Sequence, residues 1–363
     1  MYKKITACLM AMVMIGTMTA CGSKTEKAGG TPAQTADTAA SAAGEVGGDT
    51  DPALAETYTL IFSHENAESS FIHQVCLELK EKVEAATDGH VIIDIYPNSQ
   101  LGSKTDNWQA ISDNTVQMLL GVGSHMDQRF SLLTIPSLYS SVDECYEAFG
   151  PDSELFQEIE NIGEEIGIKV LLEVPIGFRT FSTNIETRNF EDIAGQDVRV
   201  MEMNEYITLW KAFGANPTPI AFSELYLALQ QGLVDAQENP LDVIVTNKLY
   251  EQQKYVVLTN HEPFFYGLCM NLQAWNALPQ AYQDAVTEVV EEIRTVAYEG
   301  GKESEAAATQ TLKDAGVTIV ELTDEDYAKM QEACEGSVYD LYRSSVGDEL
   351  FELALKTAED VKE

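Results

Sequence analysis

The feature that most constrains the fold is an alternation of short β-type runs with longer helical segments between residues 58 and 322. Tyr58–Phe62 and His90–Tyr96 are rich in β-branched and aromatic residues. Between them, Ser69–Ala86 places its apolar residues at helical spacing. Units of strand, helix and strand build mainly parallel sheets that helices cover. We therefore expect an α/β protein.

The alternation continues through the second half of the chain. Asp197–Met201 is a predicted strand and Glu205–Phe213 a predicted helix, and Ser223 is the predicted N-cap of a helix over Glu224–Gln231. The other expected strands are Val116–Gly121, Ile168–Val174, Tyr255–Leu258, Phe264–Asn271 and Val317–Leu322. The other expected helices are Thr105–Ser112 and Glu154–Ile166.

The length of 363 residues exceeds that of one ordinary domain. We therefore expect two α/β lobes with a ligand cleft between them, formed by loops that follow strands. Pro279 to about Lys313 is predicted to be one long helix, bent at Gly300 and Gly301. The acidic C-terminal tail is also expected to be helical.

The N-terminus has the pattern of a secretory signal peptide over residues 1–20, with Lys3 and Lys4 before the apolar run Ala7–Ile15. Small residues then lead to Cys21, which resembles a bacterial lipoprotein signal. We expect a lipid on Cys21, and cleavage with release of the chain is the alternative. Residues 21–56 are poor in large apolar residues, so a flexible tether to the membrane is predicted outside the cytoplasm.

The net charge is strongly negative, because 22 Lys and Arg stand against 59 Asp and Glu, which gives −37. Nucleic acid is excluded as a partner, since phosphate binding needs clustered Lys and Arg. Adhesion to an anionic lipid surface by charge alone is excluded for the same reason. An anionic ligand would require a local positive site in an acidic protein.

Motifs for catalysis, metals and cofactors are missing. The sequence has no G-x-x-x-x-G-K-[ST], no H-E-x-x-H and no C-x-x-C, so we predict no enzyme, no metal and no cofactor. Cysteines that are isolated in sequence are expected to be buried free thiols, although disulfides remain an alternative outside the cytoplasm; these are Cys76, Cys145, Cys269 and Cys334.

Two of the six arginines, Arg179 and Arg199, lie at the edges of predicted strands or loops. A guanidinium group matches a carboxylate through two parallel hydrogen bonds, which lysine cannot form. These arginines can therefore hold an organic acid in a cleft. Ordinary ion pairs at the surface are the alternative, and the residues alone do not decide between the two.

Several motifs in the sequence occur together in one known family. They are YPNSQLG at 96–102, FEDIAGQDVRV at 190–200, FGANPTP at 213–219 and AFSELYLALQQGLVDAQENP at 221–240. From about Tyr58 to the C-terminus the chain closely resembles the extracytoplasmic solute-binding proteins of TRAP (tripartite ATP-independent periplasmic) transporters, the dicarboxylate-binding DctP family. The resemblance implies a two-lobed, periplasmic-binding-protein-like fold with a long C-terminal helix linking the lobes. The expected lobes are residues 57–176 with 265–304, and residues 177–264 with 305–363.

The resemblance also implies a carboxylate site. Arg179 and Arg199 match the family arginines that grip the ligand carboxylate, and Asn239 matches the asparagine that completes this site. Phe222 matches an aromatic residue that lines the cleft, with core packing as its alternative.

Lobe one should set specificity through loops near residues 63–66 and 121–125, with Glu65, Asn66 and Ser124 as candidate ligand contacts and Trp108 a weaker one. His261 is a further candidate, and a packed or solvated histidine is its alternative. Where family members often carry a charged pair, this chain has Lys104-Thr105-Asp106-Asn107, which leaves the ligand open.

We thus expect a monomeric receptor, anchored by lipid, that binds a C4-dicarboxylate or a sugar acid and delivers it to a TRAP permease. A receptor for an ABC importer or a signalling partner is one alternative. An extracytoplasmic enzyme is a more remote one.

Overall fold

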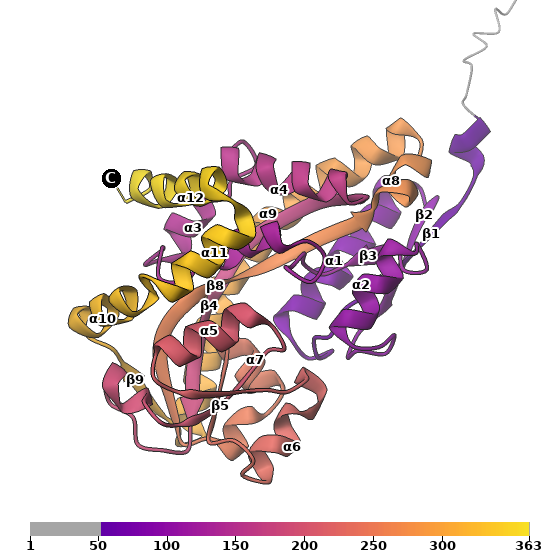
Figure 1. Cartoon of the computed structure of the whole chain (residues 1–363). Coiled ribbons are helices and arrows are strands. Elements are labelled where there is room, and N and C mark those ends of the chain that lie inside the picture. Colours follow the sequence, from indigo (N-terminus) through magenta and orange to yellow (C-terminus); the bar gives the residue numbers. More distant parts are fainter. Residues whose placement is uncertain (1–51, 363) are drawn as a thin grey trace, which may run out of the picture. The chain divides into compact units, whose positions relative to one another are not determined.

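The structure is a computed structural model and describes residues 52–362 (Figure 1). The predicted signal peptide, Cys21 and most of the predicted tether lie outside the described residues. Among the residues that are described, no helix is both long enough and apolar enough to cross a membrane.

Nine strands of the described chain form one mixed sheet in the order β2-β1-β3-β8-β4-β7-β5-β6, with β9 paired to β8. The short strands are β1 Tyr58–Ser63, β2 Val91–Tyr96, β3 Met118–Leu119, β5 Asp197–Val200, β6 Asn216–Pro219, β7 Ala236–Asn239 and β9 Thr318–Glu321. The pairs β1–β2, β1–β3, β5–β6, β5–β7 and β8–β9 are parallel, as the alternation of strands and helices predicts.

Two long strands, β4 (Ile168–Thr183) and β8 (Tyr255–Asn271), cross the middle of the sheet and pair with each other in antiparallel orientation (Figure 1). The prediction of a mainly parallel sheet is therefore wrong at its centre. The predicted strand Ile168–Val174 is only the first part of β4, and Tyr255–Leu258 and Phe264–Asn271 are two parts of β8. Polar residues interrupt the apolar pattern of both strands, yet both strands remain extended and largely buried.

Helices α1 Phe71–Ala86, α2 Lys104–Ser112, α4 Glu154–Glu165 and α5 Asn204–Ala212 lie where the sequence predicts them, to within a few residues. The sequence did not predict α3 Val142–Ala148, α7 Leu241–Thr246 or α8 Leu272–Ala277. The predicted N-cap at Ser223 is wrong. Ser223 lies inside the 3-10 turn η4 Phe222–Glu224, and α6 (Leu225–Gln230) follows without a side-chain cap.

Helix α9 runs without interruption from Gln280 to Asp314, and its two adjacent glycines allow close packing. A Cβ atom on Gly300 would lie 2.4 Å from the Phe71 ring, and one on Gly301 would lie 2.8 Å from the Ile176 Cβ. These positions therefore let α9 approach α1 and β4, and the predicted bend does not interrupt the helix. The tail is helical as predicted, in α10 Asp324–Cys334, α11 Ser337–Val346 and α12 Asp348–Asp360.

Buried apolar residues form three clusters. One joins β1, β2, α1 and α9 with Leu172 of β4 and Leu268 of β8. A second lies around α6, α7 and β9. The largest joins α4 with α5 and the three tail helices, and contains Phe181 of β4 and Val257 of β8. All four described cysteines, Cys76, Cys145, Cys269 and Cys334, are buried free thiols, as expected.

Candidate functional site

A cavity of about 200 Å³ lies beside the crossing strands, between residues from both halves of the chain. Glu65, Asn66 and Lys104 line it from the first half, and Arg199 and Phe222 line it from the second. The volume is far larger than one water molecule needs, so a small organic molecule can enter. Trp108, a weaker candidate contact, also lines the cavity.

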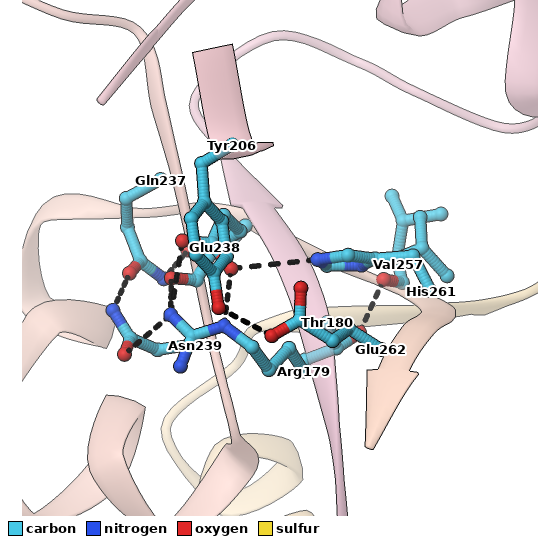
Figure 2. A network of polar contacts seen from close by, with 11 residues as sticks. Arg179, Thr180, Tyr206, Gln237, Glu238, Asn239, Val257, His261 and Glu262 are labelled. Carbon is cyan, nitrogen blue, oxygen red and sulfur yellow. Dashed lines mark hydrogen bonds and ion pairs between the residues drawn. The ribbon is translucent and has the colours of Figure 1, made fainter. Parts of the chain in front are cut away.

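Arg179 of β4 lies at the centre of a buried polar network (Figure 2). Its Nε donates to Glu238 Oε2 at 2.6 Å, and its Nη2 donates to Glu238 Oε1 at 2.9 Å and to Asn239 Oδ1 at 3.2 Å. Burial disfavours both charges, yet mutual attraction raises the pKa of Arg179 and lowers the pKa of Glu238 to about 2. This ion pair is therefore charged at neutral pH, and Nη1 of Arg179 makes no hydrogen bond with the described residues.

Arg199 of β5 lies in a different environment. Only 1% of it is exposed, and its Nε donates to the Ile220 carbonyl at 2.8 Å. Its Nη1 is buried without a hydrogen-bond partner among the described residues. Arg199 nevertheless belongs to the residues that line the cavity. Burial lowers the pKa of Arg199 to about 10, which leaves the group charged at neutral pH. A buried cation with an unused donor is costly, and an anion in the cavity would remove that cost.

Two buried carboxyl groups, Glu173 and Glu262, also line the cavity. Burial raises the pKa of each to about 8. Oε1 of Glu173 and Oε2 of Glu262 have no partner among the described residues, whereas Glu262 Oε1 accepts from Tyr206. Both carboxyl groups are therefore mostly protonated and neutral at pH 7, so they add little negative charge to the cavity.

The raised pKa of Glu173 predicts a pH dependence of stability. The folded state favours the protonated carboxyl, so this stabilisation is lost as pH rises from the ordinary value of 4.5 through about 8. We expect the free energy of unfolding to fall between about pH 6.5 and 8, by up to about 1.4 kcal/mol per pH unit for each such group. Burial lowers the pKa of His64 to about 4, so the titration of this histidine changes the free energy of unfolding only below this pH range. Urea unfolding at several pH values measures the slope.

Glu173→Gln is the matched control for this pH prediction. Because glutamine keeps the shape of the neutral acid without titrating, the slope should become shallower. An equal slope in both proteins would contradict the assignment to Glu173.

The structure brings together six of the eight predicted contact residues at the cavity wall: Arg179, Arg199, Asn239, Phe222, Glu65 and Asn66. Ser124 and His261 are not among the residues that line it. In the 121–125 loop, Gly121 and Val122 line the cavity instead. His261 is fully buried behind the network, 2.8 Å from Thr259 Oγ1 through Nδ1 and 3.4 Å from Glu238 Oε2 through Nε2.

Sequence reasoning missed three residues that shape the site: Lys104, Glu238 and Tyr206. In the sequence Lys104 stands out only as a departure from the family pattern, although it lines the cavity. Glu238 directly precedes Asn239, so the need of a buried arginine for a counter-ion could have pointed to it. No sequence signal distinguished Tyr206.

The cavity, which two buried arginines line, suits a small anionic solute, and the comparisons with known proteins agree with the class of extracytoplasmic solute-binding proteins. The sequence model of the bacterial extracellular solute-binding protein family 7, DctP, matches residues 62–345, so the chain belongs to this family. The C4-dicarboxylate-binding periplasmic protein DctP of Rhodobacter capsulatus is 31% identical over 82% of this chain and 90% of its own length.

Solved structures of TRAP periplasmic solute-binding proteins have the same fold. One from Desulfovibrio salexigens with bound orotic acid is 26% identical, with a TM-score of 0.80 over 84% of this chain and 100% of that one. Another, from Haemophilus influenzae with bound L-gulonate, is 25% identical, with a TM-score of 0.78 over 84% and 99%. The predicted two-lobed α/β fold is thereby confirmed.

Proposed function

We propose that this protein is an extracytoplasmic receptor that binds a small organic acid, a C4-dicarboxylate or a sugar acid, and delivers it to a TRAP membrane permease. The observation that carries the proposal is the buried, charged Arg199, which lines the cavity and whose Nη1 has no hydrogen-bond partner among the described residues. The names of the relative and the solved structures support an acid as the ligand, since one is a C4-dicarboxylate-binding protein and others hold orotic acid and L-gulonate.

In this proposal the ligand carboxylate lies against the two arginines. Nη1 and Nη2 of Arg199 and Nη1 of Arg179 make no hydrogen bond with the described residues, and both guanidinium groups are charged at neutral pH. Asn239 accepts from Arg179 through Oδ1 and donates to Gln237 through Nδ2 at 2.6 Å, so one amide hydrogen remains for the ligand. Phe222 covers Arg199, whose guanidinium lies 6.0 Å from its ring centroid, and helps to exclude water.

We further propose that binding is followed by closure of the two lobes, residues 57–176 with 265–304 and residues 177–264 with 305–363. The protein would act without chemical change of its ligand. A lipid on Cys21 and a tether over residues 21–56 would hold it near the permease, within about 30–35 Å of the membrane for a flexible coil of that length. The permease would use an ion gradient.

A thermal-shift screen of the purified full chain over organic acids tests the proposal. A ligand that binds only the folded state stabilises it, by about 2.7 kcal/mol at a hundredfold excess over Kd. We expect at least one dicarboxylate or sugar acid to raise the melting temperature, and mass spectrometry to recover it unchanged. No shift with any organic acid, or a chemically altered ligand, would contradict the proposed receptor.

A further inference from the structure

The first turn of α2 places two polar side chains, Lys104 and Asn107, at the wall of the cavity. They are three residues apart and therefore lie on the same side of the helix. They precede β4 in the chain, whereas Arg179 lies on β4 and Arg199 follows it. Neither contributes to the carboxylate site at Arg179, Arg199 and Asn239.

Lys104 brings a second unpaired cation to the cavity. Its Nζ lies 5.2 Å from the centroid of the Trp108 ring, and none of the carboxylates among residues 52–362 lies within 4.0 Å of it. The side chain is partly buried, and burial lowers the pKa of Lys104 while the nearby Glu65 opposes this effect. A partly desolvated ammonium group gains most from an anion that enters the same space.

Asn107 adds a hydrogen-bond acceptor of fixed orientation. It is 4% exposed, and its Nδ2 donates to the carbonyls of Gly102 at 3.1 Å and Ser103 at 2.9 Å. Because both amide hydrogens are used, the side chain cannot turn to offer a donor. Its Oδ1 is buried without a partner among the described residues, so a hydroxyl group of the ligand that donates to it would remove the cost of burying it.

Two cations at the cavity wall, Arg199 and Lys104, have no ion-pair partner within 4.0 Å among the described residues. Arg179 is matched by Glu238, and burial keeps Glu173 and Glu262 mostly protonated at pH 7. The remaining charges at the wall are Arg199 and Lys104, with Glu65 opposing them in part. Glu65 Oε1 already accepts the backbone N–H of Lys104 at 3.1 Å.

We propose that Lys104 and Asn107 form a second recognition site for the far end of the ligand, and that this site selects dicarboxylic acids that carry a hydroxyl group. Lys104 Nζ binds the second carboxylate, and Asn107 Oδ1 accepts from the hydroxyl. The inference rests on the proposed function, since the first carboxylate belongs to Arg199. A dicarboxylate without a hydroxyl leaves Asn107 unpaired, and a sugar acid with one carboxylate leaves Lys104 unpaired.

Isothermal titration calorimetry of the full chain with succinate, the two malate enantiomers, tartrate and gluconate tests the inference. We expect one of the hydroxylated dicarboxylates to bind at least ten-fold more tightly than succinate or gluconate. Removing the hydroxyl from the ligand probes Asn107 without mutating a residue that also holds the first turn of α2. Equal affinity for succinate and every hydroxylated dicarboxylate would overturn the role of Asn107.

Lys104→Met tests the other half of the site. The variant should lose at least ten-fold in affinity for the preferred dicarboxylate and keep its affinity for gluconate, while the preference for a hydroxyl persists because Asn107 is unchanged. Lys82→Met is the matched control, because it removes the same charge from α1, where Lys82 pairs with Glu292 outside the cavity.

The outcomes separate this inference from the proposed function. If organic acids bind but Lys104→Met leaves dicarboxylate affinity unchanged, the second recognition site is wrong and the receptor function stands. If none of the acids binds, both proposals fail together.

Discussion

Replacing Arg179 with methionine should lower the free energy of unfolding by about 3–5 kcal/mol, because the variant leaves an ionised carboxylate buried without its partner. Glu238 is fully buried, and its pKa of about 2 depends on Arg179. Adding Glu238→Gln to the variant removes that charge, so the double variant should recover much of the loss. Urea unfolding of the single and double variants measures both effects.

Arg129→Met is a suitable control for the Arg179 prediction. Arg129 pairs with Asp127 at 2.8 Å and Glu165 at 2.6 Å, but its side chain is 31% exposed. Its loss should cost no more than about 1 kcal/mol. A double variant as unstable as Arg179→Met alone would show that the unpaired charge of Glu238 is not the cause.

Replacing Arg199 with methionine should weaken every organic acid that the protein binds by about ten-fold to a hundred-fold, the loss of one charge-assisted hydrogen bond of about 1.5–3 kcal/mol. Stability should change by about 1 kcal/mol or less, because no carboxylate lies within ion-pair distance of Arg199 in the part of the chain that the structure describes. Calorimetry measures the affinity, and urea unfolding measures the stability.

Arg188→Met is the control for the Arg199 prediction, since Arg188 is an exposed arginine of the same half of the chain and pairs only with Glu186 among the described residues. It should leave affinity unchanged. If Arg199→Met binds acids as tightly as the unmodified protein, the carboxylate does not lie at Arg199. The two arginines thus differ in their expected roles, since Arg179 is paired with Glu238 and supports the site, whereas Arg199 is expected to bind the ligand carboxylate.

Local sequence patterns predicted the α/β class, the parallel edges of the sheet and most helices, because these depend on periodicity within short windows. They failed at β4 and β8, where the apolar pattern is interrupted at Arg179 and Glu262. Both residues lie in extended, buried backbone because partners from distant segments compensate their polar groups. Such tertiary compensation is not visible in a local window.

The candidate site was predictable to the extent that it lies in recognisable motifs. Arg179, Arg199 and Asn239 do line one cavity, but the hydrogen bond between Arg179 and Asn239 depends on how β4 pairs with β7, where Thr180 lies opposite Asn239. That register places Glu238 beside Arg179, so the Glu238 carboxylate accepts hydrogen bonds from Nε and Nη2 of the guanidinium group. Lys104 was not predicted because its role depends on the cavity and not on its neighbours in sequence.

The continuous strands β4 and β8 have a consequence for how this protein can be divided. Leu172 and Leu268 belong to one buried cluster, whereas Phe181 and Val257, on the same two strands, belong to another. The same two strands therefore help to complete more than one buried cluster, and the largest cluster also takes Ile168 and Val170 from the start of β4. A cut across β4 and β8 would leave open strand edges and incomplete clusters, so we expect the described part of the chain to unfold as one cooperative unit and not as separable modules.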